Sequence, residues 1–123
     1  MELRLRRSNR GDLALLELTG EIDLSSIPKL SDALHRLIND ERGMLVAVDL
    51  DGVIAMEDVG LGIMLGAAAT ARQHGGDLVV IATSTLMLHR LAVTRFDRAV
   101  EVVASASAVG RSFGVAEPGP GDR

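Results

Sequence analysis

The stretch that most constrains the fold is residues 44–74, which predicts a strand, an acidic loop and a helix in succession. Residues 44–48 form a continuous apolar run whose length and β-branched content are typical of a strand buried on both faces. Acids and a glycine follow in residues 49–52 and indicate a turn. Apolar residues then recur at helical spacing. We expect this helix to have Asp58 as its N-cap and to end at Gly75, with the acidic loop at the positive end of the helix dipole.

The segments on either side supply further strands and helices. The strands are expected at residues 2–6, 13–18, 77–82 and 100–103, and the helices at residues 25–39, 85–92 and 105–113, with a loop at residues 94–98. The first two strands are short and separated by a turn, which indicates a hairpin. Strands that alternate with helices indicate parallel neighbours. The predicted fold is therefore α/β: a mixed sheet, hairpin first and parallel strands after, packed with about four helices.

Length and charge limit the number of domains and the classes of possible partner. With 123 residues the chain is expected to form one domain over residues 1–114, followed by a disordered tail at residues 115–123 rich in glycine and proline. The net charge of −4 and the aromatic content of 2% argue against binding to nucleic acid or to an anionic membrane. Cysteine is absent and no apolar run is long enough to span a bilayer. We therefore expect a cytoplasmic location.

Two motifs carry a family resemblance. Residues 18–23 read Leu-Thr-Gly-Glu-Ile-Asp, and residues 48–53 and 56–62 read Val-Asp-Leu-Asp-Gly-Val and Met-Glu-Asp-Val-Gly-Leu-Gly. Together, and in this order, they resemble the signature of STAS domains, the anti-sigma-factor antagonists of bacteria. The resemblance covers nearly the whole chain and implies a single STAS-like α/β domain.

The resemblance also implies a partner and a site. In that family an anti-sigma factor of the GHKL serine-kinase type docks on the helix start and phosphorylates a serine there. Asp58 stands in the place of that serine, and Glu57 and Val59 stand in the places of its two neighbours. Asp58 could imitate the phosphorylated state or simply remove the switch, and both possibilities stay open here. The implied partner-binding residues are Asp23, Glu57, Asp58, Val59, Gly60, Gly62, Ile63 and Gly66.

Several of these residues also have simpler interpretations. Asp58 would stabilise the helix as an N-cap whatever its function. Asp23 could be a turn carboxylate that binds nearby backbone N–H groups. Glycine inside a helix costs roughly 0.5–1 kcal/mol relative to alanine, so Gly62 and Gly66 need a reason. That reason is either contact with a partner or close packing against another part of the same domain.

Catalysis has no positive support in the sequence. The acids at the predicted strand ends could hold Mg²⁺, but a phosphoryl-accepting site would also need a lysine from a late strand, and the only lysine is Lys29 in the first helix. His35, His74 and His89 lie in separate segments without metal-ligand spacing. We therefore expect no catalytic residues, no cofactor, no metal and no enzyme activity.

Two further questions stay open. The alternative function is a kinase-independent STAS scaffold or ligand-sensing subunit, for example of a lipid-transport ABC system. The oligomeric state expected is a monomer or a weak homodimer.

Overall fold

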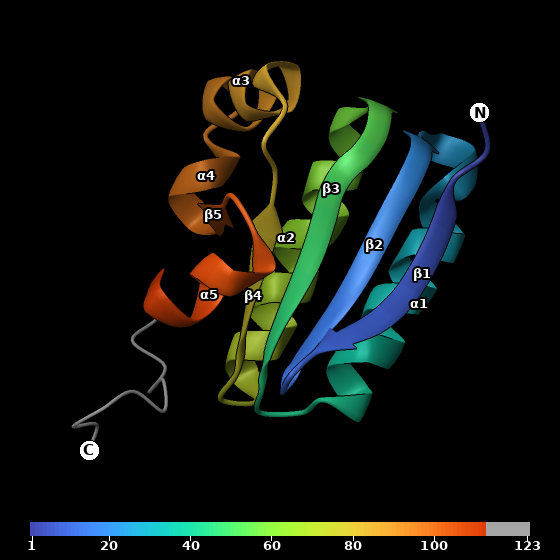
Figure 1. Ribbon diagram of the computed structural model, residues 1–123. Coiled ribbons are helices and arrows are strands. Elements are labelled where there is room, and N and C mark those ends of the chain that lie inside the picture. The colour runs from blue at the N-terminus through green and yellow to red at the C-terminus, as the bar shows by residue number, and fades with distance from the viewer. Residues whose placement is uncertain (113–123) are drawn as a thin grey trace.

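A five-stranded mixed sheet forms the centre of the computed structural model, which describes residues 1–112 (Figure 1). The strands are β1 (Arg4–Arg10), β2 (Leu13–Ile22), β3 (Leu45–Met56), β4 (Asp77–Ile81) and β5 (Glu101–Val103), in that spatial order. β1 and β2 form an antiparallel hairpin, and every other neighbouring pair is parallel. The predicted α/β fold with a mixed sheet is confirmed. The predicted tail at residues 115–123 lies outside the described residues.

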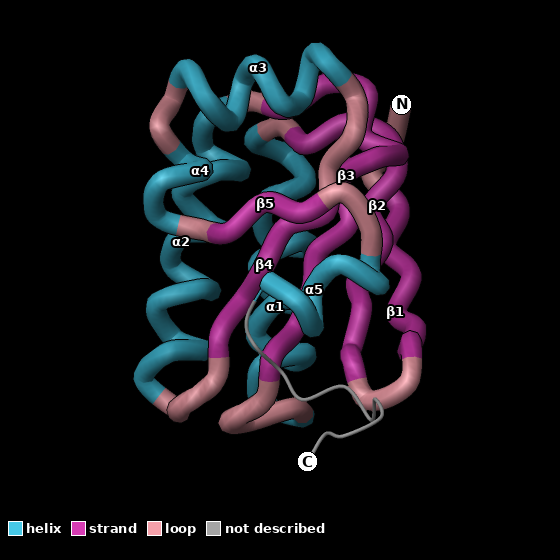
Figure 2. The backbone as a smooth tube through the Cα atoms, turned by 60° about the vertical axis from the view of Figure 1, so that its left-hand side comes forward, coloured by secondary structure: helices cyan, strands magenta, loops and turns pink. Residues whose placement is uncertain are grey.

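Helices cover both faces of this sheet unequally. They are η1 (Leu24–Ser26, a 3-10 turn), α1 (Ile27–Asp40), α2 (Asp58–Gln73), α3 (Thr85–Val93), α4 (Phe96–Ala99) and α5 (Ala106–Ser112). α1 and α2 pack on one face, and α5 lies on the other, as Figures 1 and 2 both show. α3 lies beyond the ends at which the parallel strands finish. No helix within residues 1–112 combines the length and apolar character of a membrane span.

One helix was not expected. Residues 94–98 were predicted to form a loop, but α4 occupies most of that segment. Phe96, the first residue of α4, is only 2% exposed and belongs to the main core. Arg95 adopts a left-handed conformation with φ of 63° just before it. Burial of the aromatic ring therefore decides the local structure, which helical periodicity over so few residues could not reveal.

Burial on both faces is confirmed for the central strand β3. Val46, Val48 and Leu50 join the large core cluster, to which α1 and α2 also contribute. Ala47 points the other way, into the smaller cluster that includes Val109 of α5. All five of these side chains are almost completely buried. The sheet thus contributes to two hydrophobic layers, as expected for a parallel strand flanked by helices.

The predicted turn at residues 49–52 is wrong, because β3 continues through it to Met56. Leu50 stays in the core while Asp49 and Asp51 alternate onto the more open face, so the strand period is kept. Pairing with β2 is irregular here, with register shifts on either side of Thr19 and Gly20. A methyl group at Gly52 would lie 2.8 Å from the carbonyl oxygen of Leu18. Glycine therefore allows close backbone approach at a bulge instead of making a turn.

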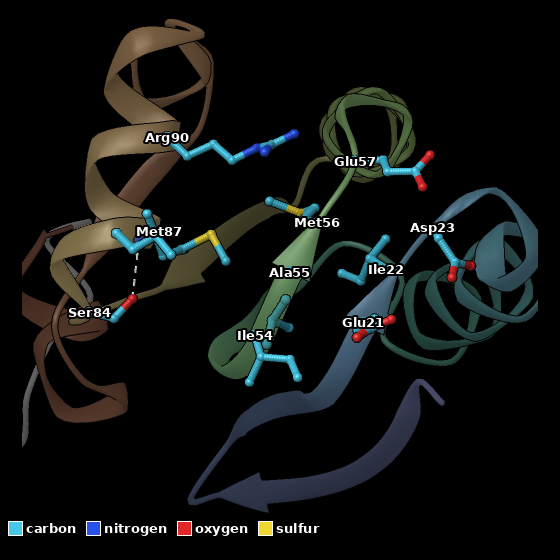
Figure 3. Close-up of a pocket in the computed structure, with 12 residues that line it drawn as sticks. Glu21, Ile22, Asp23, Ile54, Ala55, Met56, Glu57, Ser84, Met87 and Arg90 are labelled. Carbon is cyan, nitrogen blue, oxygen red and sulfur yellow. Dashed lines mark hydrogen bonds between the residues drawn. The ribbon is translucent and has the colours of Figure 1, made fainter. Parts of the chain in front are cut away.

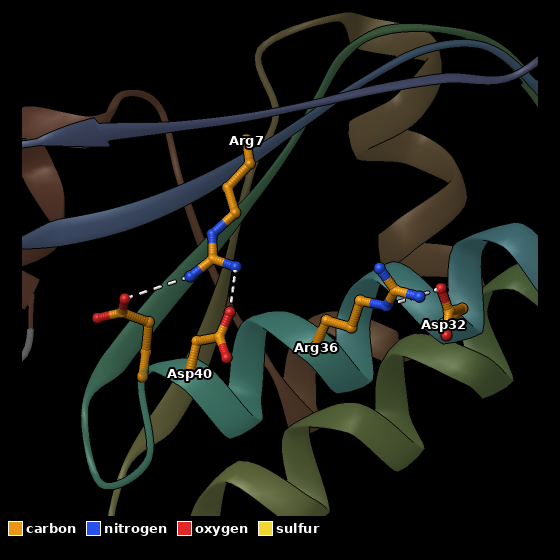
Figure 4. A network of polar contacts seen from close by, with 5 residues as sticks. Arg7, Asp32, Arg36 and Asp40 are labelled. Carbon is orange, nitrogen blue, oxygen red and sulfur yellow. Dashed lines mark hydrogen bonds and ion pairs between the residues drawn. The ribbon is translucent and has the colours of Figure 1, made fainter.

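β1 is one of the two edge strands of the sheet, and it carries arginines. Arg7 binds Asp40 at 2.7 Å and Glu41 at 3.3 Å, which ties β1 to the end of α1 (Figure 4). Arg36 and Asp32 form a further ion pair within α1. Exposed pairs of this kind typically contribute about 0–1 kcal/mol each. Their larger effect is to place charge along an edge that could otherwise pair with another chain.

Candidate functional site

α2 starts one residue earlier than expected. Glu57, in an extended conformation, is the N-cap, and Asp58 is the first helical residue. The predicted role of Asp58 as N-cap is therefore wrong. The Glu57 side chain makes no capping hydrogen bond, although its carbonyl accepts from the N–H of Gly60 at 2.9 Å. Asp58 still lies in the first turn, where a negative charge is favoured by the helix dipole.

The Asp58 carboxylate is bound by an arginine from a different helix. Nη2 of Arg90, in α3, donates to Oδ1 of Asp58 at 2.6 Å. The Asp58 side chain is 79% exposed, whereas that of Arg90 is 35% exposed. Nε of Arg90 is buried and has no hydrogen-bond partner among the described residues. No local sequence pattern points to Arg90, because the contact joins residues 32 positions apart.

Asp23 is a turn carboxylate that binds nearby groups, as its simpler interpretation predicts. Its Oδ1 accepts from the Ser25 hydroxyl at 2.7 Å and from the backbone N–H of Ser26 at 3.1 Å, which caps η1. The Ser25 hydroxyl has the largest effect and lowers the pKa of Asp23. Burial opposes it, the Ser26 N–H lowers the pKa further, and the net pKa lies below its usual value. Asp23 therefore fixes the loop between β2 and α1.

The two motif loops are joined directly. The N–H of Glu57 donates to the carbonyl of Ile22 at 2.9 Å, so the end of β3 is bonded to the end of β2. Asp23 and Glu57 consequently line one pocket of about 390 Å³, together with residues of β3 and α3 (Figure 3). In Figure 3, Arg90 extends from α3 toward the start of α2. The structure thus brings the predicted loop residues together at one end of the sheet.

The glycines of α2 divide into two kinds. Gly60 is buried, and a methyl group there would lie 2.7 Å from Cγ2 of Ile22. Its lack of a side chain therefore allows close packing inside the domain, and its place in the partner surface stays a prediction. Gly62 and Gly66 are exposed, and a methyl group at either would meet no atom within 4 Å. Packing within the described domain does not explain these two glycines.

The remaining predicted residues lie along the same part of α2. Val59 is 37% exposed and Ile63 is half-buried against the core. Together with the exposed Gly62 and Gly66 they form a surface with few protruding side chains, which we call the α2 face. Its members are Val59, Gly62, Ile63 and Gly66.

The other acids serve local structure. Oδ1 of Asp49 accepts from the N–H of Asp51 at 2.9 Å, as expected for a carboxylate held by the following backbone. Asp51 in turn accepts from the N–H and the hydroxyl of Thr83, which ties β3 to the segment before α3. Burial raises the pKa of Asp49, and the nearby charges of Asp51 and Glu17 act in the same direction.

Metal ligands do not gather anywhere in the part of the chain that the structure describes: no three histidine, aspartate or glutamate side chains there are grouped to hold an ion. Oxygen or nitrogen ligands would have to converge for a site to form. Lys29 binds the carbonyl of Leu3 at 2.5 Å, away from Asp49 and Asp51.

The fold and the joined loops define a class: a single α/β domain with an exposed helix face beside two strand ends. A family model described as "Mlab, STAS domain" matches residues 5–108, and the chain belongs to the STAS domain family. The "Anti-sigma-B factor antagonist" of Listeria monocytogenes is 28% identical over 102 residues, covering 83% of this chain and 86% of that protein.

Solved structures show the same fold. An anti-sigma factor antagonist from Mycobacterium paratuberculosis superposes with a TM-score of 0.80 at 18% identity, covering 90% of this chain and 93% of that one. The anti-sigma factor antagonist SpoIIAA in its unphosphorylated form superposes with a TM-score of 0.69 at 14% identity, covering 94% of this chain and 100% of that one. At these identities the likeness establishes the fold alone.

Replacing Gly60 and Gly62 should have opposite effects on stability. Gly60→Ala forces a methyl group against Ile22 and is expected to lower the free energy of unfolding by roughly 1–3 kcal/mol. Gly62→Ala adds a methyl group in open space and should raise it by about 0.5–1 kcal/mol, because alanine is the better helix former. Urea denaturation of both variants measures the difference. Equal effects would contradict the division between buried and exposed glycines.

Asp49→Asn should stabilise the protein at neutral pH. Because the folded-state pKa of Asp49 lies above the unfolded value near 3.8, its stability contribution is greatest in acid and falls as pH rises through the folded pKa. Asparagine removes the charge but keeps an oxygen for the Asp51 N–H. The gain in free energy of unfolding over wild type should therefore vanish at acid pH. Asp12→Asn, in the exposed hairpin turn, is the control and should change little at either pH.

Proposed function

We propose that this chain is an anti-sigma-factor antagonist that docks a serine-kinase anti-sigma factor of the GHKL type on the α2 face. The observation that carries the proposal is that Gly62 and Gly66 leave this face without side chains at two exposed positions, although nothing in the described domain packs against them. Each glycine lowers the stability of the helix, and a second protein whose backbone must approach this helix closely would explain why both are glycine. The name of the Listeria relative supports an anti-sigma factor as the partner.

Position 58 then lacks the usual chemical switch. A serine kinase transfers phosphate to a hydroxyl, and neither Asp58 nor its neighbours Glu57 and Val59 carry one. Phosphoserine would bring a charge of about −1.5 to −2 and three acceptor oxygens, whereas aspartate brings about −1. Arg90 also pairs with that single charge at 2.6 Å. The proposal is therefore that Asp58 removes the switch and does not imitate the phosphorylated state.

Binding to the kinase partner tests the docking surface. Gly62→Gln places a long side chain on the α2 face and should weaken binding of a purified GHKL-type anti-sigma factor at least about tenfold, because the partner can no longer approach. The fold should persist, since glutamine is a better helix former than glycine. Isothermal titration calorimetry gives the affinities.

The control is Thr70→Gln, about two turns further along the same helix, which should leave the affinity within about twofold. Equal losses at positions 62 and 70, or none at either, would count against the α2 face as the contact.

Phosphorylation tests the loss of the switch. Incubation of wild type with the kinase partner and ATP should leave position 58 unlabelled, because no hydroxyl is present there. Asp58→Ser should acquire phosphate at that position, as mass spectrometry of the digested protein would show. Stoichiometric label on Ser25, Ser26, Thr83 or Ser84 of the wild type would instead indicate that the switch has moved. A variant that binds the kinase but stays unlabelled would refute the assigned role of position 58.

The second candidate function is a kinase-independent STAS scaffold, such as a subunit of a lipid-transport ABC system. The missing hydroxyl at positions 57–59 favours it, because a scaffold needs no phosphorylation. A stable complex with a transport ATPase, and no binding to a GHKL kinase, would decide for the scaffold.

A further inference from the structure

We propose that the groove between the end of β3 and α3 binds a protein segment that carries an aliphatic side chain flanked by arginine or lysine. We call it the α3 groove; it is the pocket of about 390 Å³ whose lining includes Asp23, Ile54, Glu57, Leu86, Met87 and Arg90 (Figure 3). This inference deepens the proposed function and rests on it, in that the segment would belong to the partner that covers the α2 face.

The apolar lining is exposed to an extent that the fold does not need. Ile54 of β3 is 59% exposed and Leu86 of α3 is 74% exposed. Met87 and Leu91 are the buried residues of α3, and Leu86 is not needed for that packing. Large aliphatic side chains left together in a hollow are typical of a binding surface. Covering Ile54 and Leu86 would remove their apolar area from water.

The charges around the groove determine which charge a bound segment should carry. Glu21, Asp23 and Glu57 line it, and Arg90 is the only lysine or arginine in the lining. Arg90 is already paired with Asp58, and the N-terminal ammonium pairs with Glu21 at 3.1 Å. Glu57 has no ion-pair partner within residues 1–112. The unpaired charge at the groove is therefore negative, and it complements a positively charged segment.

The groove is continuous with the α2 face. Glu57 lines the groove and is followed directly by the helix that carries Val59 and Gly62. The Asp58–Arg90 pair bridges the two helices beside this junction. One partner could therefore cover the α2 face with its main contact and place a basic, aliphatic segment in the α3 groove.

Peptide titrations followed by ¹H–¹⁵N NMR test the chemistry without the kinase. The probes are three short peptides of equal length: two leucines flanked by arginines, the same leucines flanked by glutamates, and two serines flanked by arginines. Only the first should give saturable shifts, and these should centre on the amides of Ile54, Glu57 and Leu86. Its affinity should fall at higher salt, because the charge contribution is screened.

Leu86→Ser should weaken this binding at least about fivefold, because the exposed leucine supplies apolar contact area. Val93→Ser is the matched control, because Val93 is 64% exposed on the same helix but does not line the groove. The affinity of this variant for the peptide should stay unchanged. Unchanged amide dispersion shows that both variants fold.

Four results would overturn the proposal: no saturable shift with any peptide, equal binding of the glutamate peptide, equal binding of the serine peptide, or equal losses in the two variants. If the groove binds the basic peptide as expected but no GHKL kinase binds the chain, the proposed function fails while the groove chemistry stands. If the kinase binds but the peptides do not, only the groove proposal fails.

Discussion

The parallel pairing of β2 with β3 is the constraint on which the rest of the molecule depends. β3 is buried on both faces, so its register against β2 decides which side chains enter each core layer. The pairing continues past the irregular stretch near Gly20 and Gly52 to place Ile22 beside Met56. The hydrogen bond from Glu57 to Ile22 then fixes the start of α2 against the end of β2.

Close backbone approach is what makes this junction possible. Gly20 has φ of 102°, and a methyl group there would lie 2.3 Å from the carbonyl oxygen of Glu2. Gly52 meets Leu18 in the same way, and Gly60 lies against Ile22. Three glycines in different elements thus allow two loops and a helix to converge at one end of the sheet. The exposed Gly62 and Gly66 stand apart from these, because no part of the described domain approaches them.

The surface at that end combines an open helix face, a groove with exposed aliphatic side chains and mostly acidic charge. Asp58 lies between them, and its pairing with Arg90 reduces the charge it presents to a partner. Binding energy at protein interfaces usually comes from a few well-packed side chains, while charge determines which partner is accepted. The α2 face and the α3 groove have these two properties in neighbouring places.

The motifs in residues 18–23 and 48–62 were enough to predict the family and the α/β fold, because alternating strands and helices restrict the topology strongly. Hydrophobic spacing also predicted the helices that correspond to α1 and α2. It missed the extension of β3 through acidic residues, because only the pairing partner shows that Asp49 and Asp51 face away from the main core.

What the sequence determined by itself was the absence of a hydroxyl at position 58 and the periodicity that places α2 after a buried strand. Only the tertiary structure decided that Asp58 pairs with Arg90, that Gly60 is a packing residue while Gly62 is not, and that Leu86 stays exposed beside Ile54. The physical reason is that each of these depends on a neighbour far along the chain. Local spacing shows which face of an element is apolar, but not which other element meets it.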